Sequence, residues 1–322
     1  MPDAPATLDL LTVADEALHG GRMHRRDDLT RVRSGVYAAR AGWRALPPWE
    51  RYRLRVTAYA LVRPEAVFCL ESAAVLSGMP LFGEPRDIHI FDARRTRSLR
   101  FGDVAVHTSV DPRSAVTLDG VNLTSPADTA VDLGRVLPPA FALASMDAAL
   151  RGAGEFDPVT LDELIRLADR QRNPRGKRRL AWALERADAR SESTAESVSR
   201  AVIEWLGFPP PEPQASFPYR GGTDRTDFFW REHGIIGEVD GYEKYALGDP
   251  SAAARALIAE KRREDRLRRV TSGFARWGWS DAVNAAPLRE VLLTAGLPIV
   301  RSPQTSALAS LRRNPRSLPL PR

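Results

Sequence analysis

Few cysteines, few lysines and no long apolar runs characterise this sequence of 322 residues. Its single cysteine, Cys69, excludes both a disulfide framework and a cysteine-based zinc site. The N-terminus lacks a signal-peptide pattern and no stretch has the length and apolarity of a membrane span, so we expect a cytoplasmic protein without a membrane partner. The length admits two or three domains, each with a core of its own.

The positive charge is almost entirely arginine. Lysine and arginine total 47 against 41 aspartates and glutamates, which gives a formal net charge of +6, and only three of these cations are lysines. A mildly basic chain suits a polyanionic partner, and the arginine fork can donate two hydrogen bonds to one phosphate. The composition therefore favours nucleic acid as a partner without establishing it.

Apolar periodicity and turn residues divide the first 189 residues into helices and strands. A short helix is expected over 8–19, because Gly20 and Gly21 follow it, and a small basic hairpin is expected over 23–40. The other expected elements are helices over 49–62 and 71–80, strands over 86–91 and 104–109, and helices from 125 to 189.

Arginine is concentrated in the segment 166–186, which also contains Lys177, Arg178 and Arg179. A solvated helix pair with a basic loop explains this pattern. A surface that contacts phosphates explains it as well, and the sequence leaves both interpretations open.

A second pattern of helix, three strands, helix and strand begins near residue 190. Ser193 can cap a helix over 194–206, which the prolines of GFPPPEPQ end. The strands are expected in ASFPYRGG, RTDFFW, GIIGEVDG and FARWGWSD, and the long helix in SAAARALIAEKRREDRLRRV. The polar residues 301–322, rich in arginine and proline, are expected to be disordered.

Three carboxylates lie in or beside these strands. Asp227 begins one strand, and Glu238 and Asp240 point to the same side of the next because side chains alternate along a strand. A buried carboxylate is costly unless a cation compensates it, and carboxylate oxygens are ligands that suit magnesium. Asp240 alone is better explained as a turn residue before Gly241, whereas Glu238 interrupts a run that otherwise reads as core.

Two more residues allow both a structural and a functional interpretation. Lys261 lies on the helix face expected to cover the sheet, either within a salt-bridge ladder with Glu260 and Glu264 or directed at the carboxylates, where it would hold a water. Glu196 forms the pattern S-x-x-E with Ser193, which is typical of a capping box, but it is also placed to reach the carboxylate edge.

The order of these elements, together with Asp227, the motif Glu238-x-Asp240 and the helical Lys261, resembles the PD-(D/E)XK nuclease superfamily. Its very-short-patch-repair-like endonuclease branch is the most similar, and the resemblance spans about residues 190–285. It implies a restriction-endonuclease-like fold and hydrolysis of phosphodiester bonds in DNA, with roles in phage defence or DNA repair.

The resemblance also implies roles for individual residues. Asp227 and Glu238 would bind Mg²⁺ or Mn²⁺, with Glu196 holding the metal through a water and the Val239 carbonyl as an extra ligand. The metal would polarise the scissile phosphate and lower the pKa of a bound water. Asp240 occupies the usual lysine position, so the cation that orients the water would be one of the two remaining lysines, Lys261 in preference to Lys244.

The first half of the chain resembles the AbiEi-type antitoxins of abortive-infection toxin–antitoxin systems. LTRVRSGVYAAR is similar to the wing of their winged helix-turn-helix, and CLESAAVLSGMP, IHIF and LTSPADTAVDL are similar to the domain that follows, over about residues 8–150. The resemblance implies binding to DNA and a cognate toxin as a further partner. The phosphate contacts would come from Arg22, Arg25, Arg26, Arg31 and Arg33.

We therefore expect an α/β protein, α+β overall, in four parts. These are a winged-helix-like DNA-binding module over 1–65, a mixed α/β AbiEi-like middle domain with an arginine-rich helical linker over 66–189, a nuclease-like α/β domain over 190–300, and a disordered tail over 301–322. The leading function is a DNA-binding, metal-dependent endonuclease. The alternative is a non-catalytic antitoxin or transcriptional repressor whose nuclease fold has decayed.

Overall fold

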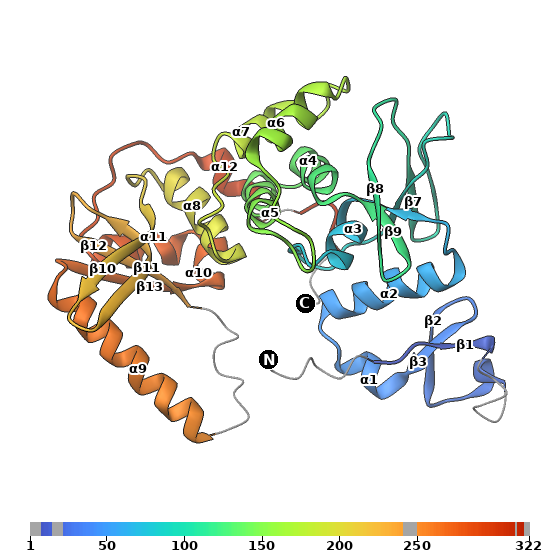
Figure 1. Cartoon of the computed structure of the whole chain (residues 1–322), viewed down its shortest axis with the longest axis horizontal. Coiled ribbons are helices and arrows are strands. Elements are labelled where there is room, and N and C mark those ends of the chain that lie inside the picture. The colour runs from blue at the N-terminus through green and yellow to red at the C-terminus, as the bar shows by residue number, and fades with distance from the viewer. Residues whose placement is uncertain (1–7, 15–21, 241–249, 313, 319–322) are drawn as a thin grey trace. The chain divides into compact units, whose positions relative to one another are not determined.

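The computed structural model describes residues 8–14, 22–240, 250–312 and 314–318. The chain forms two compact units, and each is assembled from segments that are distant in the sequence. Unit 1 comprises Met1–Arg135, Gly152–Lys177 and Pro315–Arg322, and unit 2 comprises Val136–Arg151 and Arg178–Asn314. Helices and mixed sheets alternate through both units, which confirms the α+β class (Figure 1). No helix in the described ranges is long and apolar enough to cross a membrane.

Unit 1 begins with a small antiparallel sheet in the order β1-β3-β2. It consists of β1 (Leu11–Thr12), the 3-10 helix η2 (Met23–Arg25), and the hairpin of β2 (Leu29–Arg33) and β3 (Val36–Ala39). The basic hairpin predicted over 23–40 is confirmed, and Gly35 takes a φ of 78° at its tip. The helix predicted over 8–19 is wrong for residues 8–14, because β1 pairs there with Val36 and Tyr37 of β3. The described residues therefore contain no α-helix before the β2–β3 hairpin.

Two helices connect this small sheet to a six-stranded mixed sheet. They are α1 (Arg40–Ala45) and α2 (Pro48–Val62), and the sheet has the order β6-β7-β5-β4-β9-β8. Its strands are β4 (Val67–Phe68), β5 (Ile88–Phe91), β6 (Leu99–Phe101), β7 (Val104–His107), β8 (Ala115–Leu118) and β9 (Val121–Thr124). Tyr52, Val56 and Tyr59 of α2 pack on its apolar face against Phe68 and Ile88.

The remaining helices of the first 190 residues follow the predicted order. They are α3 (Leu70–Leu76), α4 (Pro126–Val136), α5 (Pro139–Arg151), α6 (Leu161–Arg170) and α7 (Lys177–Leu184). Helix α5 is part of unit 2, where it packs on α8 (Thr194–Leu206). Ser193 caps α8 by accepting the backbone N–H of Glu196, and Gly207 ends the helix with a φ of 87°.

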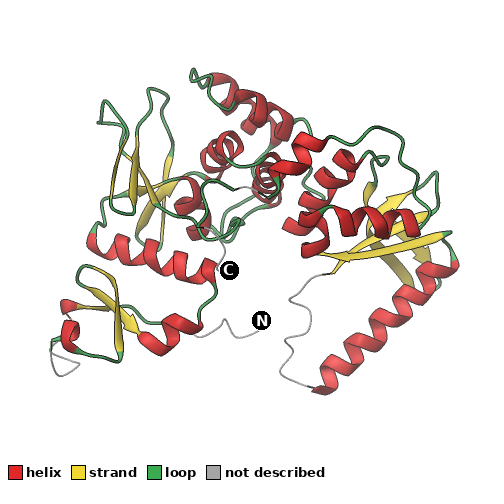
Figure 2. Ribbon diagram, turned by 180° about the vertical axis from the view of Figure 1, so that it is seen from behind, coloured by secondary structure: helices red, strands yellow, loops and turns green. Residues whose placement is uncertain are grey.

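Unit 2 contains a four-stranded sheet in the order β10-β11-β12-β13. Its strands are β10 (Glu212–Tyr219), β11 (Gly222–Trp230), β12 (Ile235–Asp240) and β13 (Gly273–Gly278). The first three are antiparallel, and α9 (Pro250–Arg269) precedes β13, which runs parallel to β12. Helices flank each of the two larger sheets (Figure 2). This element order confirms the predicted sequence of helix, three strands, helix and strand.

One face of the four-stranded sheet is aromatic. Phe228 of β11 stacks on Trp277 of β13 with ring centroids 5.7 Å apart, and the Trp277 indole donates to Ser199 Oγ of α8 at 2.9 Å. Gly237 of β12 lies between them, where a Cβ would come within 2.6 Å of the Trp277 ring. The glycine inside the apolar run GIIGEVDG is therefore required by close packing of this face.

The C-terminal residues are not disordered as a whole, which corrects the prediction for 301–322. After β13 the chain forms α10 (Trp279–Asn284), α11 (Ala286–Thr294) and α12 (Thr305–Ser310), and α12 packs against α8. Residues 315–318 then return to unit 1. Composition misled the prediction because polar, proline-containing segments can still be held by specific hydrogen bonds.

Candidate carboxylate site and basic surfaces

Strands β11 and β12 separate at the position of Asp227. Their ladder reaches the pair Phe228 and Gly237, beyond which β11 continues beside β10 and β12 continues beside β13. Asp227 Oδ2 spans this fork by accepting the backbone N–H of Val239 at 2.7 Å. The register also places Asp227 beside Glu238, the next residue of β12. Asp227 and Glu238 therefore lie at the fork together, with Asp227 inside β11 and not at its start as expected.

Glu238 is buried and bonded to an arginine. Only 6% of the residue is exposed, and Arg263 of α9 donates from Nη2 to Glu238 Oε2 at 2.8 Å. Burial raises the pKa of Glu238, the hydrogen bond from Arg263 opposes this, and the charge of Asp227 raises the pKa further. Arg263 thus supplies the positive charge that a buried carboxylate in this position requires.

Glu196 is held at the start of α8 next to the same fork. Its backbone N–H donates to Ser193 Oγ at 3.1 Å, so the predicted N-terminal cap is confirmed. Its Oε2 accepts the backbone N–H of Glu192 at 2.9 Å and the side-chain amide of Gln214 at 2.8 Å. Burial raises the pKa of Glu196 and the charge of Asp227 adds to this rise, which places Glu196 within electrostatic reach of Asp227.

Only one of the two lysines expected at this site falls within the described residues. Lys261 is exposed on α9, and Lys244 falls outside the described residues. The salt-bridge ladder foreseen for α9 is built by arginines instead: Arg263 reaches Glu260 at 2.9 Å and Arg268 reaches Glu264 at 2.7 Å. Sequence reasoning missed Arg263, because α9 carries several arginines and helical spacing alone does not select the one that meets Glu238.

Asp240 lies at the exposed end of β12. Its Oδ1 is 3.6 Å from Arg276 Nη1 on β13, and Arg276 also contacts Glu260 at 3.3 Å and Glu264 at 3.2 Å. Asp240 is thus solvated and only loosely paired, and Gly241, on which the turn-residue interpretation depends, lies outside the described residues. Arg276 links Asp240 to α9 on the face of the sheet that also contains Glu238.

A magnesium ion at the fork would depend on few protein ligands. In the described part of the chain, no three acidic, histidine or cysteine side chains converge into a complete metal cage. Mg²⁺ does not need one, because one or two carboxylates suffice when waters and a substrate phosphate complete the shell. Asp227 and Glu238 provide such hard oxygen ligands. Burial is the main cause of the raised pKa of Glu238, and the charge of Asp227 adds to it; a bound cation would offset the repulsion between the two carboxylates.

The basic hairpin of unit 1 contains two kinds of arginine. Arg25 and Arg31 are exposed, as phosphate contacts require. Arg26 pairs with Asp28 at 2.5 Å. Arg33 is half-buried: its Nη2 donates to Asp103 at 2.8 Å and its guanidinium lies 4.9 Å from the ring centroid of Tyr59. Arg33 therefore fastens the hairpin within unit 1.

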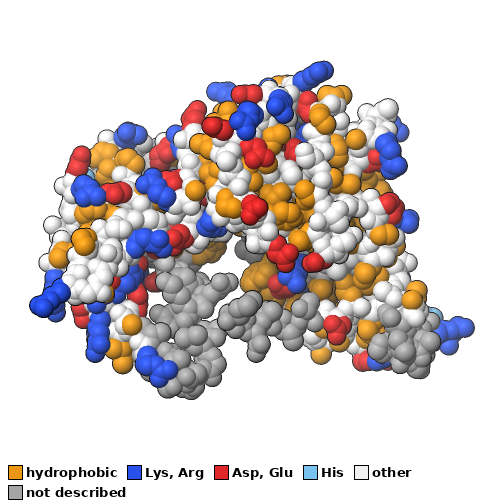
Figure 3. Space-filling model, viewed as in Figure 1, with side chains coloured by type: hydrophobic (Ala, Val, Ile, Leu, Met, Phe, Trp, Pro, Cys, Tyr) orange, Lys and Arg blue, Asp and Glu red, His pale blue; other side chains and the backbone are white. Residues whose placement is uncertain are grey.

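A second group of cations surrounds the C-terminal end of α6. The segment Gly152–Lys177 of unit 1 exposes Arg166, Arg170, Arg172, Arg175 and Lys177. Arg178 and Arg179, which follow on α7, are exposed as well. Basic side chains are visible over this region in the space-filling view (Figure 3). We call the five cations of unit 1 the α6 basic patch, and their exposure agrees with both the solvated-helix and the phosphate-contacting interpretations.

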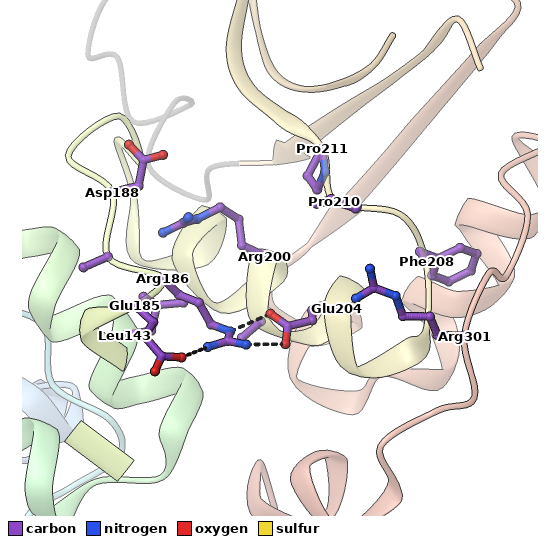
Figure 4. Close-up of a pocket in the computed structure, with 12 residues that line it drawn as sticks. Leu143, Glu185, Arg186, Asp188, Arg200, Glu204, Phe208, Pro210, Pro211 and Arg301 are labelled. Carbon is purple, nitrogen blue, oxygen red and sulfur yellow. Dashed lines mark hydrogen bonds and ion pairs between the residues drawn. The ribbon is translucent and has the colours of Figure 1, made fainter. Parts of the chain in front are cut away.

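A cavity of about 520 Å³ lies within unit 2 (Figure 4). Its lining includes Arg186, Arg200 and Arg301, but two of these guanidinium groups are already neutralised. Arg186 bonds Glu204 at 2.7 Å, and Arg200 bonds the fully buried Asp147 at 2.7 Å. The first pair joins α8 to the segment before it, and the second joins α8 to α5. Because both guanidinium groups are occupied by these structural contacts, we assign no ligand to the cavity.

Comparison with known proteins gives a family for part of the chain. Residues 66–184 match the AbiEi antitoxin C-terminal domain. Two Mycobacterium tuberculosis proteins, from different strains and named "Uncharacterized protein MT2308" and "Uncharacterized protein Rv2248", are each 34% identical to this chain over 182 residues. The aligned region covers 56% of this chain and 65% of each relative. No solved structure matches significantly. The resemblance that CLESAAVLSGMP and LTSPADTAVDL indicated is thereby confirmed for residues 66–184, which form an AbiEi-antitoxin-like domain.

Proposed function

We propose that the protein is a DNA-binding regulator of the antitoxin type, with a toxin protein as its second partner. The observation that carries this proposal is the match of residues 66–184 to the AbiEi antitoxin C-terminal domain. The exposed cations of unit 1 support it, because phosphate contacts supply much of the affinity of a DNA-binding protein. Arg25 and Arg31 of the hairpin and the α6 basic patch are the groups we assign to this role.

Fluorescence anisotropy with labelled duplex DNA tests the assignment. Arg31→Ala should weaken binding to all duplex sequences to a similar degree, since a phosphate contact carries no base information. Arg289→Ala is the matched control: Arg289 lies on α11 (Ala286–Thr294) and its guanidinium already pairs with Glu290 at 2.8 Å. Equal affinities of the wild type and Arg31→Ala would remove the hairpin from the interface.

The carboxylate fork favours a second candidate function, metal-dependent endonuclease activity in unit 2. Asp227 and Glu238 would hold the Mg²⁺ or Mn²⁺ ion. The ion, when bound, would supply a Lewis acid for a phosphodiester and an acidified water. The chain's own residues do the positioning: the Val239 N–H fixes Asp227, and Arg263 keeps Glu238 oriented and balances its charge. Lys261 projects from the same helix into solvent, where a nucleic-acid backbone would be accessible to it.

Incubation with plasmid DNA, with and without Mg²⁺ or Mn²⁺, decides between the two candidates. An endonuclease should nick or linearise the plasmid only with metal, and Asp227→Asn should abolish cleavage while preserving or improving DNA affinity, because a repulsive carboxylate is lost. Lys261→Ala should slow cleavage more than Lys244→Ala. If duplex, single-stranded and RNA substrates all stay intact while DNA is still bound, the non-catalytic regulator is the correct function.

A further inference from the structure

Residues 315–318, here called the docked tail, run antiparallel to residues 83–86 of unit 1, here called the receiving strand. The Arg86 backbone N–H donates to the Arg316 carbonyl at 3.0 Å, and the Leu318 N–H donates to the Glu84 carbonyl at 2.7 Å. These bonds flank a bridge between Pro85 and Ser317. The docked tail therefore extends the domain's backbone hydrogen bonding in the way that an added strand does.

The side chain of Arg316 enters an acidic pocket beneath this bridge. Its Nε donates to Glu71 Oε1, its Nη2 donates to Glu71 Oε2 at 2.6 Å, and the same Nη2 lies 3.0 Å from His89 Nε2. Glu71 is only 4% exposed, and it is separated from Arg316 by 245 residues of sequence. A carboxylate buried this deeply requires a cation, and here the last residues of the chain provide it.

The receiving strand is shaped for close approach. Gly83 has a φ of 84°, and a Cβ there would come within 2.3 Å of Ser317 Oγ, so a larger residue would push the docked tail away. Ser317 Oγ also accepts the Glu84 backbone N–H at 3.0 Å, and Arg86 Nε donates to the Ser317 carbonyl at 2.9 Å. Main-chain bonds, a charged anchor and a close-packed glycine together hold the docked tail against residues 83–86.

We propose that the AbiEi-antitoxin-like domain contains a binding groove for an extended, arginine-bearing peptide, and that this chain's own docked tail occupies it. Glu71, the receiving strand and His89 all fall inside the matched residues 66–184, whereas Arg316 lies outside them. The groove therefore belongs to the antitoxin-like domain and its occupant does not. A partner that presents an arginine on an extended segment would have to displace the docked tail, which has the concentration advantage of an intramolecular ligand.

A labelled synthetic peptide, NPRSLPLPR, which has the sequence of residues 314–322, tests the proposal with the full-length chain. The double substitution Arg316→Ala and Leu318→Pro removes the anchor and one backbone donor of the docked tail, and so empties the groove. The peptide should bind this variant about tenfold or more tightly than the wild type, where the docked tail competes. Arg312→Ala, which removes an exposed charge before the docked tail, is the matched control and should bind like the wild type.

Two additions make the test decisive. A peptide with alanine in place of its arginine, and a chain that also carries Glu71→Gln, should both lose binding. Equal binding of the two peptides, or no binding to a folded double variant, would overturn the proposal. Hydrogen exchange on the wild type covers the case in which the double variant does not fold. The amides of Arg86 and Leu318 should be protected, and exchange at the rate of an unstructured peptide would also refute the docked tail.

Discussion

Arg31 and Arg33 are two residues apart on one strand, yet their surroundings assign them different tasks. Arg31 is exposed, whereas Arg33 bonds Asp103 and packs over Tyr59. Arg55 donates to the same Asp103 at 3.1 Å, so the carboxylate joins the hairpin to α2. The sequence grouped the two arginines together because both lie in a basic hairpin. They are distinguished by Asp103, which is distant from both in the sequence and pairs with Arg33.

This difference predicts opposite phenotypes for the two alanine substitutions. Arg33→Ala should lower the free energy of unfolding by about 1 kcal/mol, through the lost ion pair and the lost contact with Tyr59. Arg31→Ala should leave it unchanged within error and affect DNA binding alone. Urea denaturation followed by circular dichroism measures both. A destabilised Arg31→Ala with a fully stable Arg33→Ala would contradict the assignment.

Residue types at the carboxylate fork could be predicted from the sequence, but their partners could not. Alternation along GIIGEVDG placed Glu238 correctly, and the S-x-x-E pattern located the cap at Ser193. The cation beside Glu238 was assigned to a lysine, whereas the structure places Arg263 there. Which side chain of α9 reaches a strand depends on the tilt and rotation of the helix on the sheet, and a single sequence does not encode these explicitly.

Among the secondary-structure elements, long periodic segments were predicted and several short ones were missed. The helices α2, α8 and α9 follow from apolar spacing and end signals. Strands β4, β6, β8 and β9, of two to four residues, were missed, although β5 and β7, of four residues each, were predicted; the missed strands exist because they pair within a six-stranded sheet. The expected helix over 8–19 fails at residues 8–14 for the same reason, since pairing with β3 overrides local preference in β1.

The close packing of strand β12 against aromatic rings gives a prediction about stability. Gly237→Ala would place a Cβ within 2.6 Å of the Trp277 ring and 3.0 Å of the Trp230 ring, so we expect a loss of about 1–3 kcal/mol in unfolding free energy. Gly278→Ala, at the end of β13, is the control, because its Cβ would approach no closer than 3.8 Å to Asp281. Thermal denaturation compares the two. A Gly237→Ala chain as stable as the control would refute the close-packed aromatic face.

The pocket of the docked tail predicts how stability depends on pH. Burial lowers the pKa of His89 to about 3, and Arg316 lowers that of Glu71 to about 2 although burial opposes it. Both pKa values lie below the ordinary values of 6.5 and 4.5. The stability that the fold gains from a neutral His89 and an ionised Glu71 is therefore complete at neutral pH, and it is lost as the pH falls from about 6.5 towards about 2.

Denaturant titrations from neutral pH to about pH 3 measure this dependence. Burial also lowers the pKa of His107, whose Nε2 lies 2.9 Å from His89 Nδ1. The wild type should lose unfolding free energy more steeply with acid than Glu71→Gln, which has no carboxylate to protonate. Identical slopes for the two chains would mean that Glu71 is not held ionised by the docked tail.

For the whole molecule, the division into units does not follow the order of the sequence. Unit 2 takes α5 from the middle of the chain, and unit 1 takes back residues 315–322. The matched residues 66–184 include segments of both units. Such an assembly could not be predicted from composition shifts, because it rests on contacts such as Asp147 with Arg200, and Glu71 with Arg316, that join residues far apart in the chain.

The central claim, that the chain binds DNA through exposed cations of unit 1, is tested most directly by equilibrium binding to duplex DNA over a range of salt concentrations. Each neutralised phosphate contributes about −0.9 to the slope of log affinity against log salt, so contacts from all the assigned cations of the hairpin and the α6 basic patch predict a slope of about −6. Arg31→Ala should make that slope less steep by about one contact. An affinity that does not change with salt, or no binding at low salt, would contradict the account.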